Sequence, residues 1–448
     1  MKQRNLRLRA NVALLSAILL FFLTNNGAYC ASSRRRRRSS QRLRRLPSTK
    51  AGKEQHVHDA DFVHDSDNNS EGTNEEQTTI KNEETTADAS DSKCSMSPSQ
   101  YETTLRQLIL TITPQDVLDT TTSSQSKAFH WLTHEDAISP PLCPPSLDNV
   151  HVDGGYARAV LLLERYVMAA FYYATNGDEW KECSANTMNN NTCTRTITAQ
   201  SSEVLSFVIE QAFNDESSTT TTTEHGRKIG TKSWLSDTPT CDWGGLGCSH
   251  TSVGNDSNNN EEGYYTIDHI EFEDNNLDGT LLPELSTLHN LKFLILEKGK
   301  LHGSIPSSYG SLSNLRVLDM DYNQLTGTLS SELYDLVELR ELDLNDNRLN
   351  GTIGVEIGRL SELVYLQLDN NEFSGDIPME VGELMELTWA VFHGNNFSGE
   401  IPLSVCENKD DGAGSNQGKI TLLTADCLED DGPVVCSCCD YCGEEEPL

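Results

Sequence analysis

The chain has 448 residues and a formal net charge of −34. Its first 50 residues hold 13 of the 34 Lys and Arg residues and none of the 68 Asp and Glu residues, so the remainder is strongly acidic. An acidic surface of this kind repels phosphate backbones, which excludes nucleic acid as the main partner.

Residues 1–30 have the pattern of a secretory signal peptide. Four basic residues precede an apolar run from Ala10 to Leu23, and small residues around Cys30 offer a cleavage site. The apolar run has 14 residues, whereas a membrane-spanning helix needs about 18 or more. An uncleaved signal anchor is the alternative, and only in that case would the chain contact a membrane. Both readings predict the secretory pathway and an extracellular or cell-surface location.

Residues 31–97 begin with a basic run and continue as an acidic, polar segment, which predicts a disordered linker. The sequence from Arg42 to Arg45 matches an R-x-x-R processing site. A solvated basic linker explains the same residues, so processing after Arg45 stays open.

Residues 98–265 are expected to form a helical cap with polar insertions. Apolar residues recur there at helical spacing. The spacing predicts helices at 101–111, 125–137, 159–173 and 203–213, with the insertions around 186–194 and 219–223.

Residues 266–407 contain a repeat of fixed length. Aligned on one polar position, six copies follow each other at steps of 24 residues, at Asn275, Gly299, Asn323, Asn347, Asn371 and Asn395. A Leu or Phe stands two residues after each of these positions, and a Gly stands four residues after. Six copies at one period predict a solenoid.

The residue types explain the repeat physically. A short strand supplies inward-facing apolar side chains, and the Asn side chain satisfies backbone groups that the following turn would bury unpaired. Glycine permits the tight bend, and single coils gain a core only by stacking. Gly299 lacks the amide, so we expect the second coil to be less well tied.

These motifs resemble the plant-type leucine-rich repeat, L-x-x-L-x-L-x-x-N-x-L-x-G-x-I-P. Residues 172–180 and 234–248 resemble the N-terminal cap of such proteins, with about fifty residues inserted between them. The resemblance implies an α/β solenoid with parallel strands on the concave face, 3-10 or irregular segments on the convex face and a disulfide between Cys241 and Cys248. Algal leucine-rich-repeat proteins, receptor-like ectodomains and polygalacturonase-inhibiting proteins are similar.

Residues 408–448 are expected to close the solenoid with a degenerate seventh repeat and a cysteine-rich acidic tail. Cys406 and the five cysteines of this segment allow 15 pairings, and the partners of Cys94, Cys143, Cys183 and Cys193 are also open. A zinc site in the CSCCDYC cluster is the alternative, but an exported chain favours disulfides. We therefore expect no metal and no cofactor.

The strand register predicts three solvent-facing columns on the concave sheet. The first is unusually aromatic and the third is acidic, which favours a basic ligand or simply a solvated surface. The first column is His269, Phe293, Val317, Glu341, Tyr365 and Trp389; the second is Glu271, Ile295, Asp319, Asp343, Gln367 and Val391; the third is Glu273, Glu297, Asp321, Asn345, Asp369 and His393. The expected ligand-binding residues are Trp389, Tyr365, Phe293, Val391, Gln367, Asp369, Asp321, Glu297 and His393.

No nucleophile-elbow, zincin, P-loop or kinase signature occurs in the sequence. We therefore expect an exported, non-enzymatic recognition protein that binds a protein or peptide, in an oligomeric state that the sequence does not indicate. A structural or adhesive wall or matrix glycoprotein is the alternative. Sequons that support glycosylation stand at Asn68, Asn190, Asn255, Asn350 and Asn396, the last two arising within the repeat motif itself.

Overall fold

The computed structural model describes residues 96–138, 143–145, 155–185, 193, 228–255, 261–409, 419–427 and 433–443. All of these lie in one of the two units of the chain, Ser92–Leu448. The expected leader 1–30, the Arg45 site, nearly all of the linker 31–97 and the expected helix 203–213 lie outside the described residues. So do Cys94, Asn68 and Asn190.

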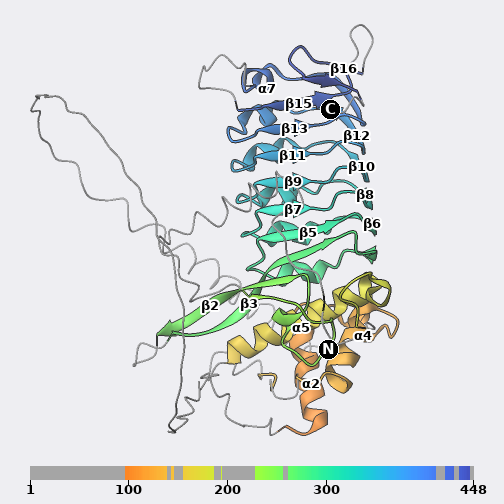
Figure 1. Ribbon diagram of the computed structural model, residues 1–448, viewed down its shortest axis with the longest axis vertical. Helices are drawn as coiled ribbons and strands as arrows, with labels where there is room; N and C mark the ends of the chain where they lie inside the picture. Colours follow the sequence, from red (N-terminus) through yellow and green to blue (C-terminus); the bar gives the residue numbers. More distant parts are fainter. Residues whose placement is uncertain are drawn as a thin grey trace, which may run out of the picture. The chain divides into compact units, whose positions relative to one another are not determined.

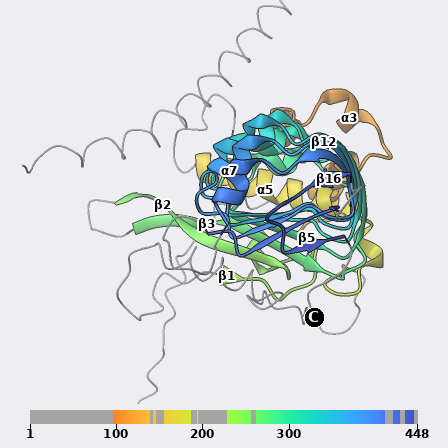
Figure 2. The ribbon, with the colours of Figure 1, turned by 90° about the horizontal axis from the view of Figure 1, so that it is seen from above.

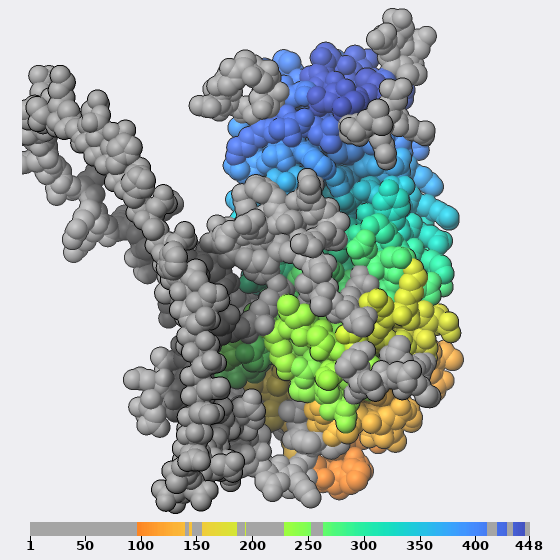
Figure 3. Space-filling view, viewed as in Figure 1, coloured from red at the N-terminus to blue at the C-terminus, as the bar shows by residue number. Residues whose placement is uncertain are grey.

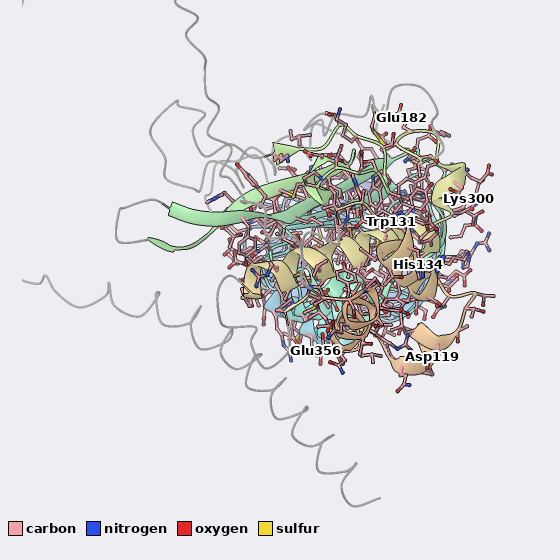
Figure 4. All side chains as sticks on the ribbon, turned by 90° about the horizontal axis from the view of Figure 1, so that it is seen from below. Asp119, Trp131, His134, Glu182, Lys300 and Glu356 are labelled. Carbon is pink, nitrogen blue, oxygen red and sulfur yellow. A yellow bond between two sulfur atoms is a disulfide. The ribbon has the colours of Figure 1, made fainter. Side chains whose placement is uncertain are left out.

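Helices form the N-terminal end of this unit (Figure 1). Three match helices expected from the apolar spacing: α2 (Pro98–Ile109), α4 (Ser124–His134) and α5 (Gly155–Ala174). A short helix, α3 (Gln115–Asp119), was not expected, because five residues are too few to show a periodicity. Seen from this end, Trp131 of α4 lies inward and Asp119 of α3 lies at the edge (Figure 4).

A ten-stranded sheet runs the length of the solenoid, in the order β1-β2-β3-β5-β7-β9-β11-β13-β15-β17 (Figure 1). The first three strands pair antiparallel, and from β3 onward every pair is parallel. Residues 24 apart face each other in successive coils, as Tyr365 and Trp389 do. The strands are β1 (Lys228–Ile229), β2 (Leu246–Asn255), β3 (Glu261–Glu273), β5 (Phe293–Glu297), β7 (Val317–Asp319), β9 (Glu341–Asp343), β11 (Tyr365–Gln367), β13 (Trp389–Val391), β15 (Leu422–Ala425) and β17 (Tyr441–Cys442).

A second sheet, not expected from the sequence, forms where each coil leaves the Asn turn. Its order is β16-β14-β12-β10-β8-β6-β4, and its pairs are parallel. Here the chain is extended on both sides of the motif glycine, so equivalent residues of neighbouring coils can pair. The strands are β4 (Asp278–Thr280), β6 (Lys300–Gly303), β8 (Gln324–Gly327), β10 (Arg348–Gly351), β12 (Glu372–Asp376), β14 (Asn396–Glu400) and β16 (Val434–Val435).

The third side consists of one 3-10 turn in each of five successive coils, as the resemblance implied, and of the short α-helix α7 in the next coil. Seen along the solenoid, β5, β12 and α7 lie on different sides of the coil (Figure 2). In the space-filling view the coils stack above the cap, from cyan to blue (Figure 3). The convex segments are η4 (Pro283–Thr287), η5 (Ser307–Ser311), η6 (Ser331–Asp335), η7 (Val355–Arg359), η8 (Met379–Glu383) and α7 (Leu403–Glu407); η2 (Gly177–Glu179) and η3 (Thr240–Asp242) belong to the cap.

The repeated asparagine ties each coil to its neighbour, as expected. The Asn347 amide donates to the carbonyls of Met320, Leu344 and Asn345 at 2.9–3.2 Å, and its Oδ1 accepts from the N–H of Leu325 at 2.9 Å. Asn323, Asn371 and Asn395 make the equivalent bonds. At Gly299 no side chain can do so, and an added Cβ would lie 2.8 Å from Oδ1 of Asn323.

Disulfides staple both ends of the solenoid. Cys241 and Cys248 are joined, as the resemblance implied, and Cys143 is also disulfide-bonded. The pairings that the sequence left open are Cys183–Cys193, Cys406–Cys438, Cys427–Cys442 and Cys436–Cys439. β15 extends the sheet beyond β13, so the weak seventh copy does form a further coil.

None of the helices in the described ranges has the length and apolar character needed to cross a membrane.

Candidate binding face

Successive side chains of each strand point to opposite sides of the ten-stranded sheet. On one side Leu294, Leu318, Leu342 and Leu366 belong to the main core, which continues into the cap. The other side is the concave face, where the three predicted columns lie.

The first column is not open to solvent, which corrects our expectation. His269, Phe293 and Val317 are fully buried, Glu341 is 2% exposed and Tyr365 is 7% exposed. Parallel strands about 4.8 Å apart bring the side chains of one column into contact. Phe293, Val317 and Tyr365 accordingly join Ile295 in a second apolar cluster. Phe293 is therefore buried support and not an exposed contact.

Trp389 is the aromatic residue of this column that stays partly exposed. Its ring stands edge-on to Tyr365, with the ring centroids 5.6 Å apart and the planes at 89°. Trp389 packs against the second cluster, and Val391 on the same strand is buried. The indole is thus held by rigid neighbours while part of its surface remains accessible.

Polar side chains flank Trp389 on the same face. His393 Nε2 lies 3.8 Å from Asp369 Oδ2, and His393 Nδ1 lies 2.9 Å from the Thr424 hydroxyl. Gln367 is partly exposed and donates its amide to Asp343. These groups offer a hydrogen-bonding rim around one aromatic ring.

Tyr322 is a further exposed side chain that the three columns missed. It is 49% exposed and stands directly before Asn323, with a φ of 47°. Lys298 and Asn370 occupy the same place in their coils and also have positive φ. The repeat motif leaves this position unspecified, and that freedom is the sequence signal that points to it.

The acidic residues of the concave face are mostly buried, which changes their chemistry. Burial, followed by repulsion from Glu297, raises the pKa of Asp321 to about 7 and that of Glu341 to about 8. Burial and neighbouring carboxylates hold the pKa values of Asp319 and Asp343 well above the ordinary range. The predicted acidic column is therefore not a uniformly ionised surface at neutral pH.

Comparison with known proteins agrees with this geometry. Residues 289–349 match the leucine rich repeat family model. These coils are leucine-rich repeats. The repeated asparagines Asn323, Asn347, Asn371 and Asn395 form a ladder of hydrogen bonds between coils, which we call the asparagine ladder. With this ladder and the 24-residue period, the coils form a solenoid of the plant type.

Several solved structures are similar to parts of the chain. A TDR receptor is 32% identical with a TM-score of 0.32, and the Arabidopsis receptor kinase HAESA, solved with the peptide hormone IDA and the co-receptor SERK1, is 33% identical with a TM-score of 0.32. Each similarity covers 35% of this chain and 25% of the other. The SOBIR1 ectodomain from Arabidopsis thaliana is 27% identical with a TM-score of 0.33, over 36% of this chain and 86% of that one. No curated protein sequence matches the chain.

Proposed function

We propose that the chain is an exported, non-enzymatic recognition protein that binds a protein or peptide on its concave face. The observation that carries this proposal is Trp389, a partly exposed indole held edge-on against buried Tyr365. Rigid aromatic side chains are the commonest energetic anchors of protein interfaces. Stacked repeats supply the extended concave surface that such an anchor needs.

The proposed contact set is narrower than the one expected from sequence. It consists of Trp389, Gln367 and His393, with Tyr322 added because it is exposed. Five other expected residues are buried and are left out of the set: Tyr365, Phe293, Val391, Glu297 and Asp369. Asp321 is left out because its Oδ1 is buried. A hydrogen-bonding partner with one apolar group suits this set better than a strongly basic one, because several of the carboxylates have raised pKa values.

Export is supported by the disulfides at both ends of the solenoid, since such bonds persist in oxidising compartments. We further propose glycans at Asn350 and Asn396 on the second sheet. Asn350 is half-buried and Asn396 is exposed. A glycan on that sheet would leave the concave face free.

Affinity capture from the surface and medium of the producing cells tests the proposal. The intact chain is compared with Trp389→Ala and with Met379→Ala, because Met379 is an exposed apolar residue of the convex η8. We expect one partner to be retained by the intact chain and by Met379→Ala but lost by Trp389→Ala. Capture that is equal for all three, or tight association with an insoluble wall fraction that ignores Trp389, would favour the structural alternative.

A further inference from the structure

Three carboxylates converge on the concave face in the middle of the solenoid. Asp319 on β7 pairs directly with Asp343 on β9, and Glu341 precedes Asp343 by two residues on the same side of the strand. One carboxylate oxygen from each lies within 4.8 Å of the others, and all three side chains are buried. Two oxygens bound to one calcium ion at about 2.4 Å each lie at most about 4.8 Å apart.

The cluster has an oxygen without a partner. Glu341 is 2% exposed, and in the described part of the chain its Oε2 makes no hydrogen bond. A buried carboxylate oxygen in this state loses its hydration without compensation. Oδ1 of Asn345 and Oδ1 of Asp321 are also buried and unpaired, two residues after the ends of the same two strands.

The neighbouring charges do not balance this cluster. Within the described residues, each charged group that shifts the pKa values of the three carboxyls is another carboxylate. The other contacts of Asp343 are neutral: the N–H of Asn345 at 3.1 Å and the amide of Gln367. Buried carboxylates are accommodated either by holding protons or by coordinating a cation.

We propose that Asp319, Glu341 and Asp343 bind a calcium ion on the concave face. All the donors are hard oxygens with no imidazole or thiolate among them, which disfavours zinc and other softer metals. Calcium accepts six to eight oxygens in irregular arrangements, whereas magnesium demands near-ideal octahedral geometry and retains its waters. The unpaired oxygens of Asn345 and Asp321, two residues after Asp343 and Asp319, are further candidate ligands. This site does not depend on the proposed binding of a protein or peptide.

Calcium alone is the probe for this site. The full-length chain is treated with a chelator, and calcium binding is followed by calorimetry and by Tm. Terbium luminescence excited through Tyr365, which pairs with Glu341 across the strands, locates the ion. The variants are Glu341→Gln and Asp343→Asn, with Glu362→Gln as the control because Glu362 is an exposed carboxylate of the same solenoid.

We expect calcium to raise the Tm of the intact chain and of Glu362→Gln. In Glu341→Gln and Asp343→Asn, calcium affinity should fall roughly tenfold or more and the terbium signal should be lost. Both variants replace a buried carboxyl, whose ionised form burial disfavours, by a neutral amide, so their Tm without calcium should stay at or above that of the intact chain. An intact chain that does not respond to calcium, variants that respond as it does, or an equal response to magnesium would each overturn the assignment.

Discussion

Arg165 and Asp136 form a bidentate ion pair inside the N-terminal cap. Nε and Nη2 of Arg165 each lie 2.7 Å from a carboxylate oxygen of Asp136, and the two side chains are 2% and 0% exposed. The Cζ atom of Arg165 also lies over the rings of Trp131 and Trp243, 5.0 and 4.8 Å from their centroids. One charged group thus joins α4, α5 and the cap loop that carries Trp243.

Removing Asp136 should destabilise the cap severely. Asp136→Ala leaves the Arg165 charge buried and unpaired, which costs about 3–5 kcal/mol. Asp335→Ala is the matched control, because it breaks an exposed pair with Arg359 that contributes at most about 1 kcal/mol. Urea denaturation followed by tryptophan fluorescence measures both. Equal losses in the two variants would contradict the structural role given to the buried pair.

The asparagine ladder should contribute to stability in proportion to the bonds each member makes. Asn371→Ala removes the bonds to the carbonyls of Leu344, Leu368 and Asp369 and leaves the N–H of Leu349 unpaired. We expect a loss of about 2–4 kcal/mol in the free energy of unfolding. Asn314→Ala, which removes one exposed bond to His289, should cost about 1 kcal/mol or less. Similar, small losses of unfolding free energy in both variants would contradict a stabilising role for the ladder.

The stability of the cap should fall as pH rises, because of Glu164. Burial raises the pKa of Glu164 to about 8, against a hydrogen bond from the N–H of Ile267 that lowers it. Between pH 4.5 and about 8 the folded chain keeps a proton that the unfolded chain has released. Stability contributed by this group is therefore complete below pH 4.5 and is lost as pH approaches 8.

Glu164→Gln removes this titration and isolates its effect. The free energies of unfolding of intact chain and variant are compared from pH 4.5 to 8. The intact chain should lose up to about 1.4 kcal/mol of unfolding free energy per pH unit relative to the variant as pH rises. Parallel curves would show that Glu164 is ionised in the folded chain throughout.

The C-terminal disulfides should contribute different amounts to the stability of the chain, according to the length of the loop that each closes. Cys406 and Cys438 are 32 residues apart, whereas Cys436 and Cys439 are three apart. Chain entropy assigns about 3–4 kcal/mol to the longer loop and about 1.5 kcal/mol to the shorter one. Replacing both cysteines of each pair by serine, followed by thermal unfolding and limited proteolysis, tests the difference. Equal effects of the two replacements would mean that loop length does not govern the stability of this end.

The repeat could be predicted from sequence almost completely, because its 24-residue period is imposed by backbone needs that recur in every coil. Asn347 and Asn371 do what their spacing indicates. The burial of Phe293 and Glu341 could not be predicted, because it depends on packing over the concave face and not on strand alternation. The converging carboxylates arise from residues 24 apart that are neighbours only across strands. The sequence placed Asp319 and Asp343 in one column but gave no measure of their desolvation.

The most direct test of the proposed function is photo-crosslinking from the concave face. A photoreactive amino acid is placed at Gln367, beside Trp389, or at Val355 on the convex side, and each protein is irradiated on the producing cells. We expect one defined crosslinked partner from position 367, abolished by Trp389→Ala, and none from position 355. Crosslinks from position 355 alone, or from position 367 regardless of Trp389, would contradict recognition through the concave face.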